Sequence, residues 1–462
     1  MIEKNPLVRA GLKLADFAER WFPDAFVFAL LGVVITFLGG LAVGEAPLKL
    51  VQVFGDAFSK KLAVFTLQMM LVIVGGYVVA SSPPVYALIK KLATVPRSSR
   101  QAVAFVALLS MVSSLFSWGL SLIFTGLLVR EICTRLPRVD YRAIGAAAYL
   151  GLGSVWAFGL SSSAALMQAT RSSLPDKLHA VTGVIPLSQT IFLWQSMLCA
   201  VLLISVSVAI AYFSCPSDEQ AKTQEDFGIR YQPLTVEVEP PQRPGEWWEH
   251  TPILPWAVGL LMLVYVLFKL SGPGGPGEKL DLDLFNFSFI TLGLLLHGQA
   301  KSFLKAVSAS IPATAGVIIQ FPFYAGIFGL ISETHLSVVL EDIFRSISSP
   351  ATFPLLVAVY SAVLGVFVPS GGGKWVIEAP YVMGLANEYQ INLGWTVQIY
   401  NAAEALPNLL NPFWMLPLMG ILSVRARELA GYSVLQLLFH VPLVLLLCWV
   451  LTGTLPYTPP VP

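Results

Sequence analysis

Eleven stretches of this 462-residue chain, each at least 17 residues long, contain no Asp, Glu, Lys or Arg. A helix needs about 20 apolar residues to cross the ~30 Å hydrocarbon layer of a bilayer, so these stretches predict an all-α polytopic membrane protein. The composition agrees, because 56% of the residues are hydrophobic, 12% are charged and the formal net charge is +1. This balance excludes a single soluble globule, a disordered chain and a nucleic-acid-binding protein. The stretches are Ala25–Gly44, Leu62–Ile89, Gln101–Val129, Ala143–Thr170, Ala180–Ser217, Thr251–Phe268, Leu284–Ala300, Ala306–Ser332, Ser346–Gly373, Ala405–Val424 and Leu429–Leu451.

Basic residues predict the orientation of these stretches, because short cytoplasmic loops are enriched in Lys and Arg. Four basic residues and no acidic residue lie in the loop 90–100, and four arginines lie in the loop 130–142. Both loops are therefore expected in the cytoplasm. A single crossing between them would place one of them outside, so the stretch 101–129 must enter and leave by the same face. We interpret this stretch as a re-entrant helical hairpin.

The order of elements predicts an inverted-topology repeat. Residues 217–250 contain eight acidic residues, three basic residues and four prolines, as expected for a solvated loop. One extra membrane helix after this loop reverses the orientation, so a second set of elements in the same order runs upside down, a plan common in secondary transporters. The mixed-charge amino terminus is expected in the cytoplasm, without a cleaved signal peptide. The expected units are a first repeat of four spans plus the hairpin 101–129 (1–216), an acidic cytoplasmic loop (217–250), a connecting transmembrane helix (251–270), and a second repeat of four spans plus the hairpin 350–386 (271–462).

Each expected repeat contains a broken hairpin followed by a broken transmembrane helix. Segments rich in Ser, Gly, Pro and Asn interrupt the apolar stretches at 113–121, 151–163, 368–374 and 407–412. Irregular backbone is tolerated at membrane depth only where protein buries it or a water-filled cavity faces it. A half-helix that begins there exposes unpaired N–H groups and the positive end of its dipole, which favour a small anion such as a carboxylate. Half-helix carboxyl ends and Asn carbonyls can hold a coupling cation.

Three ionisable residues lie in apolar surroundings beside these breaks, and such residues are functional candidates because their charge is costly within a membrane. Glu404 precedes the second broken helix and is a candidate carrier of a coupling proton or cation. The alternative for Glu404 and Glu378 is a carboxylate that is paired or faces water near a helix end. Lys374 either attracts an anion or extends its ammonium group to the membrane interface.

Motifs for enzymatic chemistry are missing from the sequence. It contains neither HExxH nor GxSxG, and its four cysteines are far apart, without Cys or His at metal-ligand spacing. We therefore expect no enzyme and no metal site, and no cofactor beyond a coupling H⁺ or Na⁺. A channel is the alternative to a carrier, but an inverted repeat with two hairpins favours alternating access.

Four segments carry a family resemblance. They are VPSGGGxWVIxxP at Val368–Pro380, IxQFPFYAGI at Ile318–Ile327, NPFW at Asn411–Trp414 and ASSxPV at Ala80–Val85. With them the chain resembles, over nearly its whole length, the bacterial short-chain fatty acid transporter family. That family belongs to the ion-transporter group of inverted-repeat secondary carriers. The resemblance implies cation-coupled import of acetoacetate, butyrate or similar small monocarboxylates across the bacterial inner membrane, and it suggests a homodimer. The expected partners are this substrate and membrane lipid, and no nucleic acid.

In the larger group, hairpin tips and adjacent broken helices hold the substrate and the coupling cation. The first hairpin departs from the family pattern, in which Asn is usual at the position of Ser117 and Gly at that of Ser121, and an amide is common at that of Glu378. Two alternatives to a monocarboxylate carrier remain. The first is a carrier for dicarboxylates or another small organic anion, which a second fixed positive group in the site would favour; Lys374 is the candidate for that group. The second is a non-transporting membrane scaffold or enzyme. The substrate-binding residues implied by the resemblance are Ser117, Trp118, Gly119, Ser161, Ser163, Ser370, Gly371, Gly372, Gly373, Asn408 and Asn411, with Glu404 as the cation-coupling candidate.

Overall fold

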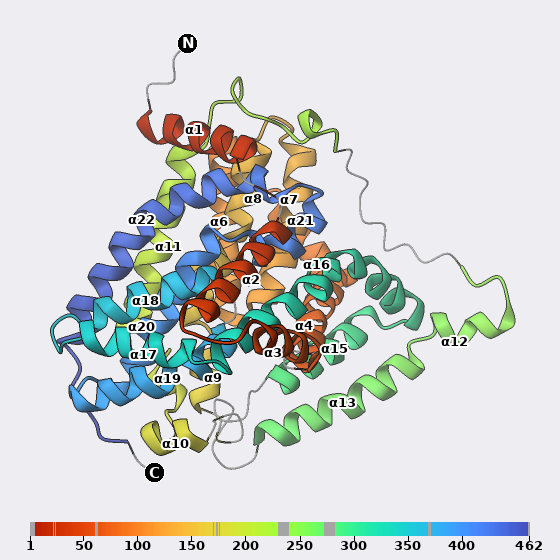
Figure 1. Ribbon diagram of the computed structural model, residues 1–462. Coiled ribbons are helices and arrows are strands. Elements are labelled where there is room, and N and C mark those ends of the chain that lie inside the picture. Colours follow the sequence, from red (N-terminus) through yellow and green to blue (C-terminus); the bar gives the residue numbers. More distant parts are fainter. Residues whose placement is uncertain are drawn as a thin grey trace.

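The computed structural model describes residues 5–21, 23, 25–60, 63–169, 171, 174, 176–229, 240–271, 282–367 and 371–460. All regular elements within these ranges are helices, as predicted (Figure 1). Up to residue 229 they are α1 (Pro6–Trp21), α2 (Ala25–Ala42), α3 (Pro47–Lys60), α4 (Ala63–Ser81), α5 (Pro83–Leu92), α6 (Ser99–Phe116), α7 (Trp118–Arg135), α8 (Tyr141–Leu150), η1 (Gly151–Val155), η2 (Trp156–Phe158), α9 (Ser163–Ala169), α10 (Asp176–Thr182), η4 (Leu187–Gln189), α11 (Trp194–Ser214) and η5 (Glu225–Phe227).

From residue 240 onward the helices belong to the second half of the chain. They are η6 (Pro244–Glu246), α12 (Trp247–His250), α13 (Ile253–Ser271), α15 (Leu282–His297), α16 (Ala300–Ser332), α17 (Leu336–Ile347), α18 (Phe353–Phe367), α19 (Gly371–Glu388), α20 (Leu393–Ala405), η7 (Leu406–Leu409), η8 (Pro412–Met415), α21 (Leu416–Leu422) and α22 (Ala426–Thr452). The label η marks the short 3₁₀ turns of this half, which lie before α12 and between α20 and α21.

Several of these helices can span a membrane. Among the described residues, six helical stretches have the length and apolar composition to cross a bilayer, and the number is eight if each of two bent pairs forms one span. The pairs are α4 with α5, bent by 72°, and α20–η7 with η8–α21, bent by 74°. α2, α15 and α18 are apolar but shorter. This set agrees with the predicted all-α polytopic architecture.

Burial differs between central and peripheral helices. In the stretch Tyr141–Ala169, 94% of the apolar window is buried inside the protein, whereas in Pro244–Ser271 the share is 17%. α13 lies at the edge of the molecule and packs against α15 (Figure 1). Its side chains Leu261 and Phe268 are 71% and 73% exposed. A helix that is apolar all round and so little covered by protein is expected where lipid is the solvent.

Helices are interrupted in three of the four segments that the sequence predicts. α6 and α7 pack side by side and are separated by the single residue Ser117, whose extended backbone ends one helix and caps the next. α8 changes at Gly151 into a π turn and a 3₁₀ turn, and residues 159–162 are non-helical before α9 begins. α20 ends in 3₁₀ turns on either side of Asn411. Of the expected break at 368–374, residues 371–374 form the first turn of α19, and residues 368–370 lie outside the described residues.

Other elements differ from the expected spans. The apolar stretch 180–217 is not one helix, because Pro186 and the turn η4 delay the start of α11 to Trp194. α3 and α17 are helices in segments expected to be loops. Their apolar residues recur at helical spacing but are interspersed with charged ones, so no charge-free stretch marks them.

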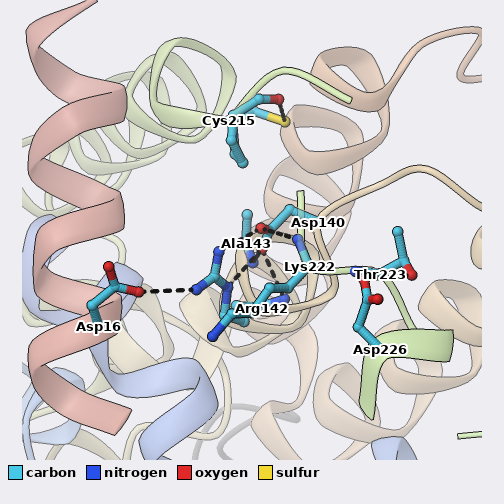
Figure 2. Close-up of polar contacts among 9 residues, drawn as sticks. Asp16, Asp140, Arg142, Ala143, Cys215, Lys222, Thr223 and Asp226 are labelled. Atoms are coloured by element: carbon cyan, nitrogen blue, oxygen red, sulfur yellow. Dashed lines mark hydrogen bonds and ion pairs between the residues drawn. The ribbon is translucent and has the colours of Figure 1, made fainter. Parts of the chain in front are cut away.

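A buried ion pair joins three parts of the chain at the start of α8 (Figure 2). Asp140 caps the helix by accepting hydrogen bonds from the backbone amides of Arg142 and Ala143, at 3.1 and 3.0 Å. Its carboxylate also lies 2.8 Å from the Arg142 guanidinium and accepts a hydrogen bond from the backbone amide of Lys222 at 3.0 Å. Arg142 lies 3.7 Å from Asp16 of α1. Asp140 and Arg142 are 0% and 1% exposed, so this network ties α1 and the loop after α11 to the start of α8.

Loss of the Asp140 carboxylate should destabilise the protein. We expect Asp140→Ala to lower the free energy of unfolding by about 3–5 kcal/mol, because the buried Arg142 charge loses its ion pair at 2.8 Å and α8 loses its cap. Asp140→Asn keeps an acceptor for the helix cap and should cost less. Thermal unfolding of the purified protein in detergent measures both, with Asp226→Asn in the exposed part of the same loop as the control. Equal melting temperatures for Asp140→Ala and the control would contradict this role.

Candidate functional site

A short non-helical segment, residues 159–162, and the first residue of α9 connect the two predicted hairpins. Ser161 Oγ accepts a hydrogen bond from the backbone amide of Trp118, in the turn between α6 and α7, at 3.1 Å. Ser163, two residues later, lies against the start of α19, where a Cβ added to Gly371 would be 3.6 Å from Ser163 Oγ. The first broken helix therefore contacts both hairpins, and four of the predicted site residues come together there.

The start of α19 is packed too tightly for a side chain at Gly371, whereas a Cβ on Gly372 would make ordinary contacts. A Cβ on Gly371 would lie 2.8 Å from the Trp156 ring, and one on Gly372 would lie 3.5 Å from Ser163 Cβ. Glycine lets the backbone approach its neighbours this closely. α19, an 18-residue helix, begins at Gly371, so the positive end of its dipole lies here.

Two buried donors in this region have no acceptor among the described residues. They are Trp156 Nε1 and Ser162 Oγ, on side chains that are 4% and 0% exposed. A buried donor without an acceptor costs about 1–3 kcal/mol. An ionised carboxylate only accepts hydrogen bonds, so it is the kind of group that such donors could bind.

α18, α19 and α20 meet at a buried group of charges, Lys374, Glu378 and Glu404, which we call the ionic cluster. Lys374 Nζ lies 2.5 Å from Glu404 Oε2 on α20 and 3.3 Å from Glu378 Oε1, one turn further along α19. The ammonium also donates to the backbone carbonyl of Ser361 on α18 at 2.5 Å, and the Ser361 hydroxyl donates to Glu378 Oε2 at 2.5 Å. The three charged side chains are at most 1% exposed.

The contacts of the three ionisable residues bear on the alternatives that the sequence left open. Lys374 does not extend to the membrane interface, because its side chain is fully buried. Glu378 and Glu404 are both paired carboxylates, but they share a single cation.

Tyr400 links the ionic cluster to the start of α19. The centre of its ring is 4.6 Å from Lys374 Nζ, a cation–π contact, and its hydroxyl donates to the carbonyl of Gly371 at 2.6 Å. The Trp375 ring packs on Tyr400 with ring centres 4.5 Å apart. One side chain thus touches both the ammonium group and the tight glycine turn.

The predicted asparagines bind backbone groups at the breaks. Asn408 Nδ2 donates to the carbonyl of Leu152 at 3.4 Å, which joins η7 to the π turn of the first broken helix. Asn411 Nδ2 donates to the carbonyl of Val366 on α18 at 3.1 Å, and its Oδ1 accepts from the amide of Phe413. Both side chains are 2% exposed and join the two broken helices to their neighbours.

The remaining predicted residues lie in the two hairpins. Ser117 Oγ accepts a hydrogen bond from the amide of Leu120 at 3.2 Å and so caps α7. Gly119 lies against α4, where an added Cβ would come within 2.2 Å of a Val72 methyl group. Gly373 belongs to the first turn of α19, and Ser370 lies outside the described residues.

Hydroxyl groups of α6 and α7 complete the hydrogen bonding around the π turn. Ser110 Oγ donates to the carbonyl of Ala148 at 2.7 Å and accepts from the amide of Gly151 at 2.9 Å. Thr125 Oγ1 donates to the same Ala148 carbonyl at 3.0 Å, and Ser121 Oγ donates to the carbonyl of Ser110 at 2.7 Å. The only sign of this role in the sequence is that small hydroxyl residues recur within an otherwise apolar hairpin.

Comparisons with known proteins identify the family. A family model described as "Short chain fatty acid transporter" matches residues 7–452. The chain belongs to the short-chain fatty acid transporter family. A protein of Escherichia coli (strain K12), named as a candidate short-chain fatty acid transporter, is 32% identical over 429 residues, which cover 92% of this chain and 96% of the relative. A Haemophilus influenzae protein with the same name is 27% identical over 441 residues, covering 94% and 98%.

Membership of the short-chain fatty acid transporter family confirms the resemblance found in the sequence. Together with the apolar helices, it makes this chain a multi-pass membrane protein of a transporter family. The crystal structure of the Alcanivorax borkumensis YdaH transporter is similar in fold, with a TM-score of 0.50 and 16% sequence identity, covering 95% of this chain and 100% of that one. At this identity the likeness concerns the fold alone.

Sequence reasoning missed three side chains of the candidate site. Tyr400 precedes Glu404 by one helical turn, so the two side chains lie on the same face of a helix, and this spacing could have indicated that Tyr400 belongs to the site. Trp156 lies between the two interruptions of its helix, but an aromatic residue there is also typical of a packed core. Ser361 gave no signal, because its contact with Lys374 and Glu378 depends on how α18 packs.

Removal of the shared cation should destabilise the ionic cluster, and removal of one acid should compensate for it. We expect Lys374→Met to lower the free energy of unfolding by about 3–5 kcal/mol, because it leaves two carboxylates buried without a cation. The double variant Lys374→Met/Glu404→Gln leaves one buried carboxylate and should recover part of the loss. Thermal unfolding in detergent at neutral pH measures both variants. A double variant less stable than Lys374→Met would show that the ion pairs do not determine the effect.

Proposed function

We propose that this chain is a secondary active transporter that imports short-chain fatty acids or related small monocarboxylates, such as acetoacetate and butyrate, coupled to a cation. The start of α19 is the observation that carries the proposal. It combines the amino end of a long helix and a glycine backbone with buried donors on Trp156 and Ser162 that have no acceptor. These are neutral hydrogen-bond donors suited to one carboxylate. The names of the relatives support the substrate class.

The ionic cluster favours a monocarboxylate over the dicarboxylate alternative. A second carboxylate would need a second positive group in the site. Lys374 is the candidate, but its ammonium group already contacts Glu378, Glu404 and the Ser361 carbonyl. It therefore has no free position for a second substrate charge.

We place the transporter in the bacterial inner membrane, with a cytoplasmic amino terminus. In this arrangement α6–α7 and α18–α19 are the re-entrant hairpins of two inverted repeats, and a rocking or elevator-type motion exposes the site to each side in turn. The basic loops at 90–100 and 130–142 support this orientation, and the break at Ser117 supports the first hairpin. The functional unit is a homodimer in this proposal.

Counterflow tests the substrate class without an imposed ion gradient. Liposomes containing the purified protein and loaded with unlabelled acetoacetate should transiently accumulate labelled acetoacetate or butyrate from outside. Unlabelled short monocarboxylates should compete, and dicarboxylates such as succinate should not. Competition by succinate alone would favour the dicarboxylate alternative, and the absence of counterflow with every acid tested would refute the proposal.

A side chain at the start of α19 should block transport. We expect Gly371→Val to reduce counterflow by at least about 10-fold, because the side chain would fill the space against Trp156 and Ser163 and displace the helix end. Gly372→Val should act in the same direction. Gly384→Val is the matched control on the same helix, since a Cβ there meets nothing within 4 Å. Equal counterflow in Gly371→Val and the control, at equal amounts of inserted protein, would contradict this assignment.

A further inference from the structure

We propose that the ionic cluster of Lys374, Glu378 and Glu404 takes up and releases one proton in each transport cycle, so that the proton is the coupling ion. This inference rests on the proposed function and deepens it, because it names the ion and the residues that carry it. The observation behind it is that α19 and α20 together bury one lysine and two glutamates.

The charges of the ionic cluster do not balance. One ammonium group and two carboxylates give a net charge of −1, and all three side chains are at most 1% exposed. A buried charge without a partner is costly, so two carboxylates beside one cation favour sharing one proton. With that proton bound, the ionic cluster is neutral. The pair of carboxylates then exchanges a proton as one unit.

The proton can bind to either carboxylate. The Lys374 ammonium lies 3.3 Å from Glu378 Oε1 and 2.5 Å from Glu404 Oε2, and the Ser361 hydroxyl donates to Glu378 Oε2. Uptake forms an O–H bond on one of the two carboxylates with a proton from the outer side. Release breaks the same bond towards the inner side.

The surroundings fit a proton better than a metal cation. The position between the carboxylates is taken by the Lys374 ammonium, whose charge would repel a second cation. Space is also limited, because a Cβ on Gly365 would lie 3.0 Å from Glu404 Oε2 and 2.8 Å from Pro407. A proton needs neither a cavity nor a set of ligands.

The other titratable groups near the ionic cluster are weaker candidates. Tyr400 of α20, Tyr381 of α19 and Tyr360 of α18 face it, and tyrosine hydroxyls ordinarily titrate near pH 10. Glu341 of α17 faces the tyrosines and is partly exposed. The segments η1, η2, α9 and η7 also pack against α20 but contain no titratable side chain.

Several titratable or charged side chains on other helices that meet α18, α19 or α20 make contacts of their own. His440 of α22 pairs with Ser207 of α11 at 2.7 Å. Arg345 of α17 lies 3.5 Å from Glu388, the last residue of α19. α10 also meets that end of α19, where Asn387 donates to the carbonyl of Val181. The two carboxylates of the ionic cluster therefore remain as the groups that exchange the proton.

The position of the ionic cluster couples the proton to the substrate. Lys374 lies in the first turn of α19, directly behind the glycines that would face the substrate carboxylate, and Tyr400 touches both. A net charge of −1 so close to the helix start repels an anion and offsets the positive potential at that end of the helix. Protonation removes that repulsion, so the proton and the monocarboxylate bind together and cross the membrane as a neutral pair.

Infrared difference spectroscopy tests the inference without any substrate. Spectra of the purified wild-type protein between acidic and alkaline pH should contain the carbonyl band of one buried protonated carboxyl group. The band should disappear in Glu378→Gln and in Glu404→Gln, since one lysine and one carboxylate balance without a proton. Glu341→Gln is the matched control and should keep the band. A wild-type protein without this band, or a band that persists in both cluster variants, overturns the inference.

Gradient-driven transport tests the same point in liposomes. An inward proton gradient should raise wild-type uptake of labelled acetoacetate above counterflow, after subtraction of uptake by protein-free liposomes. This increase should be lost in Glu404→Gln and retained in Glu341→Gln. Lys374→Met/Glu404→Gln should regain it, because a single carboxylate again needs one proton to be neutral. Uptake that increases with a sodium gradient but not with a proton gradient would overturn the inference and leave monocarboxylate transport intact.

The two proposals can fail separately. Absence of counterflow refutes only the proposed function, whereas the infrared band tests the proton site whether or not transport is observed.

Discussion

Backbone groups at the ends of broken helices must find partners where water does not reach them, and the rest of this structure depends on how they do so. Around the π turn of the first broken helix, hydroxyl groups of Ser110 and Thr125 bind the Ala148 carbonyl, and Ser110 also accepts from Gly151. The side-chain amide of Asn408 donates a hydrogen bond to the carbonyl of Leu152, which lies far away in the chain. These bonds hold the irregular segments in place, so that their polar backbone groups are satisfied by protein partners.

The polar groups of the centre divide into a neutral set and a charged set. Ser161, Ser163 and the glycines of α19 form the neutral set, where the first broken helix meets both hairpins. The ionic cluster lies just behind it, on α18, α19 and α20. A buried ion pair is weak evidence for stability, since its desolvation offsets most of its attraction. An acid in excess of the available cation is harder still to explain by stability, which is why we assign the ionic cluster a role in transport.

Parts of this arrangement could be predicted from residue types alone. Charge-free stretches identified the long helices, and the Gly, Ser and Asn segments identified the places where helices end. Ser163 and Gly371 were selected separately, each from its own break, and the fold brings them together. The pairing of Lys374 with Glu404 could not be predicted, because 30 positions and a helix break separate them in the chain. α3 and α17 were missed because charged residues interrupt their apolar faces.

The amino-acid sequence by itself determined that lipid is the solvent, where helices run and where they break. These properties follow from local composition, since a stretch of apolar residues or a run of glycines acts on the backbone that contains it. Only the tertiary structure decided which breaks meet, which donors lack acceptors and how many carboxylates share Lys374. Those properties depend on distances between helices far apart in the chain, and hydrogen bonds and ion pairs act only over a few ångströms.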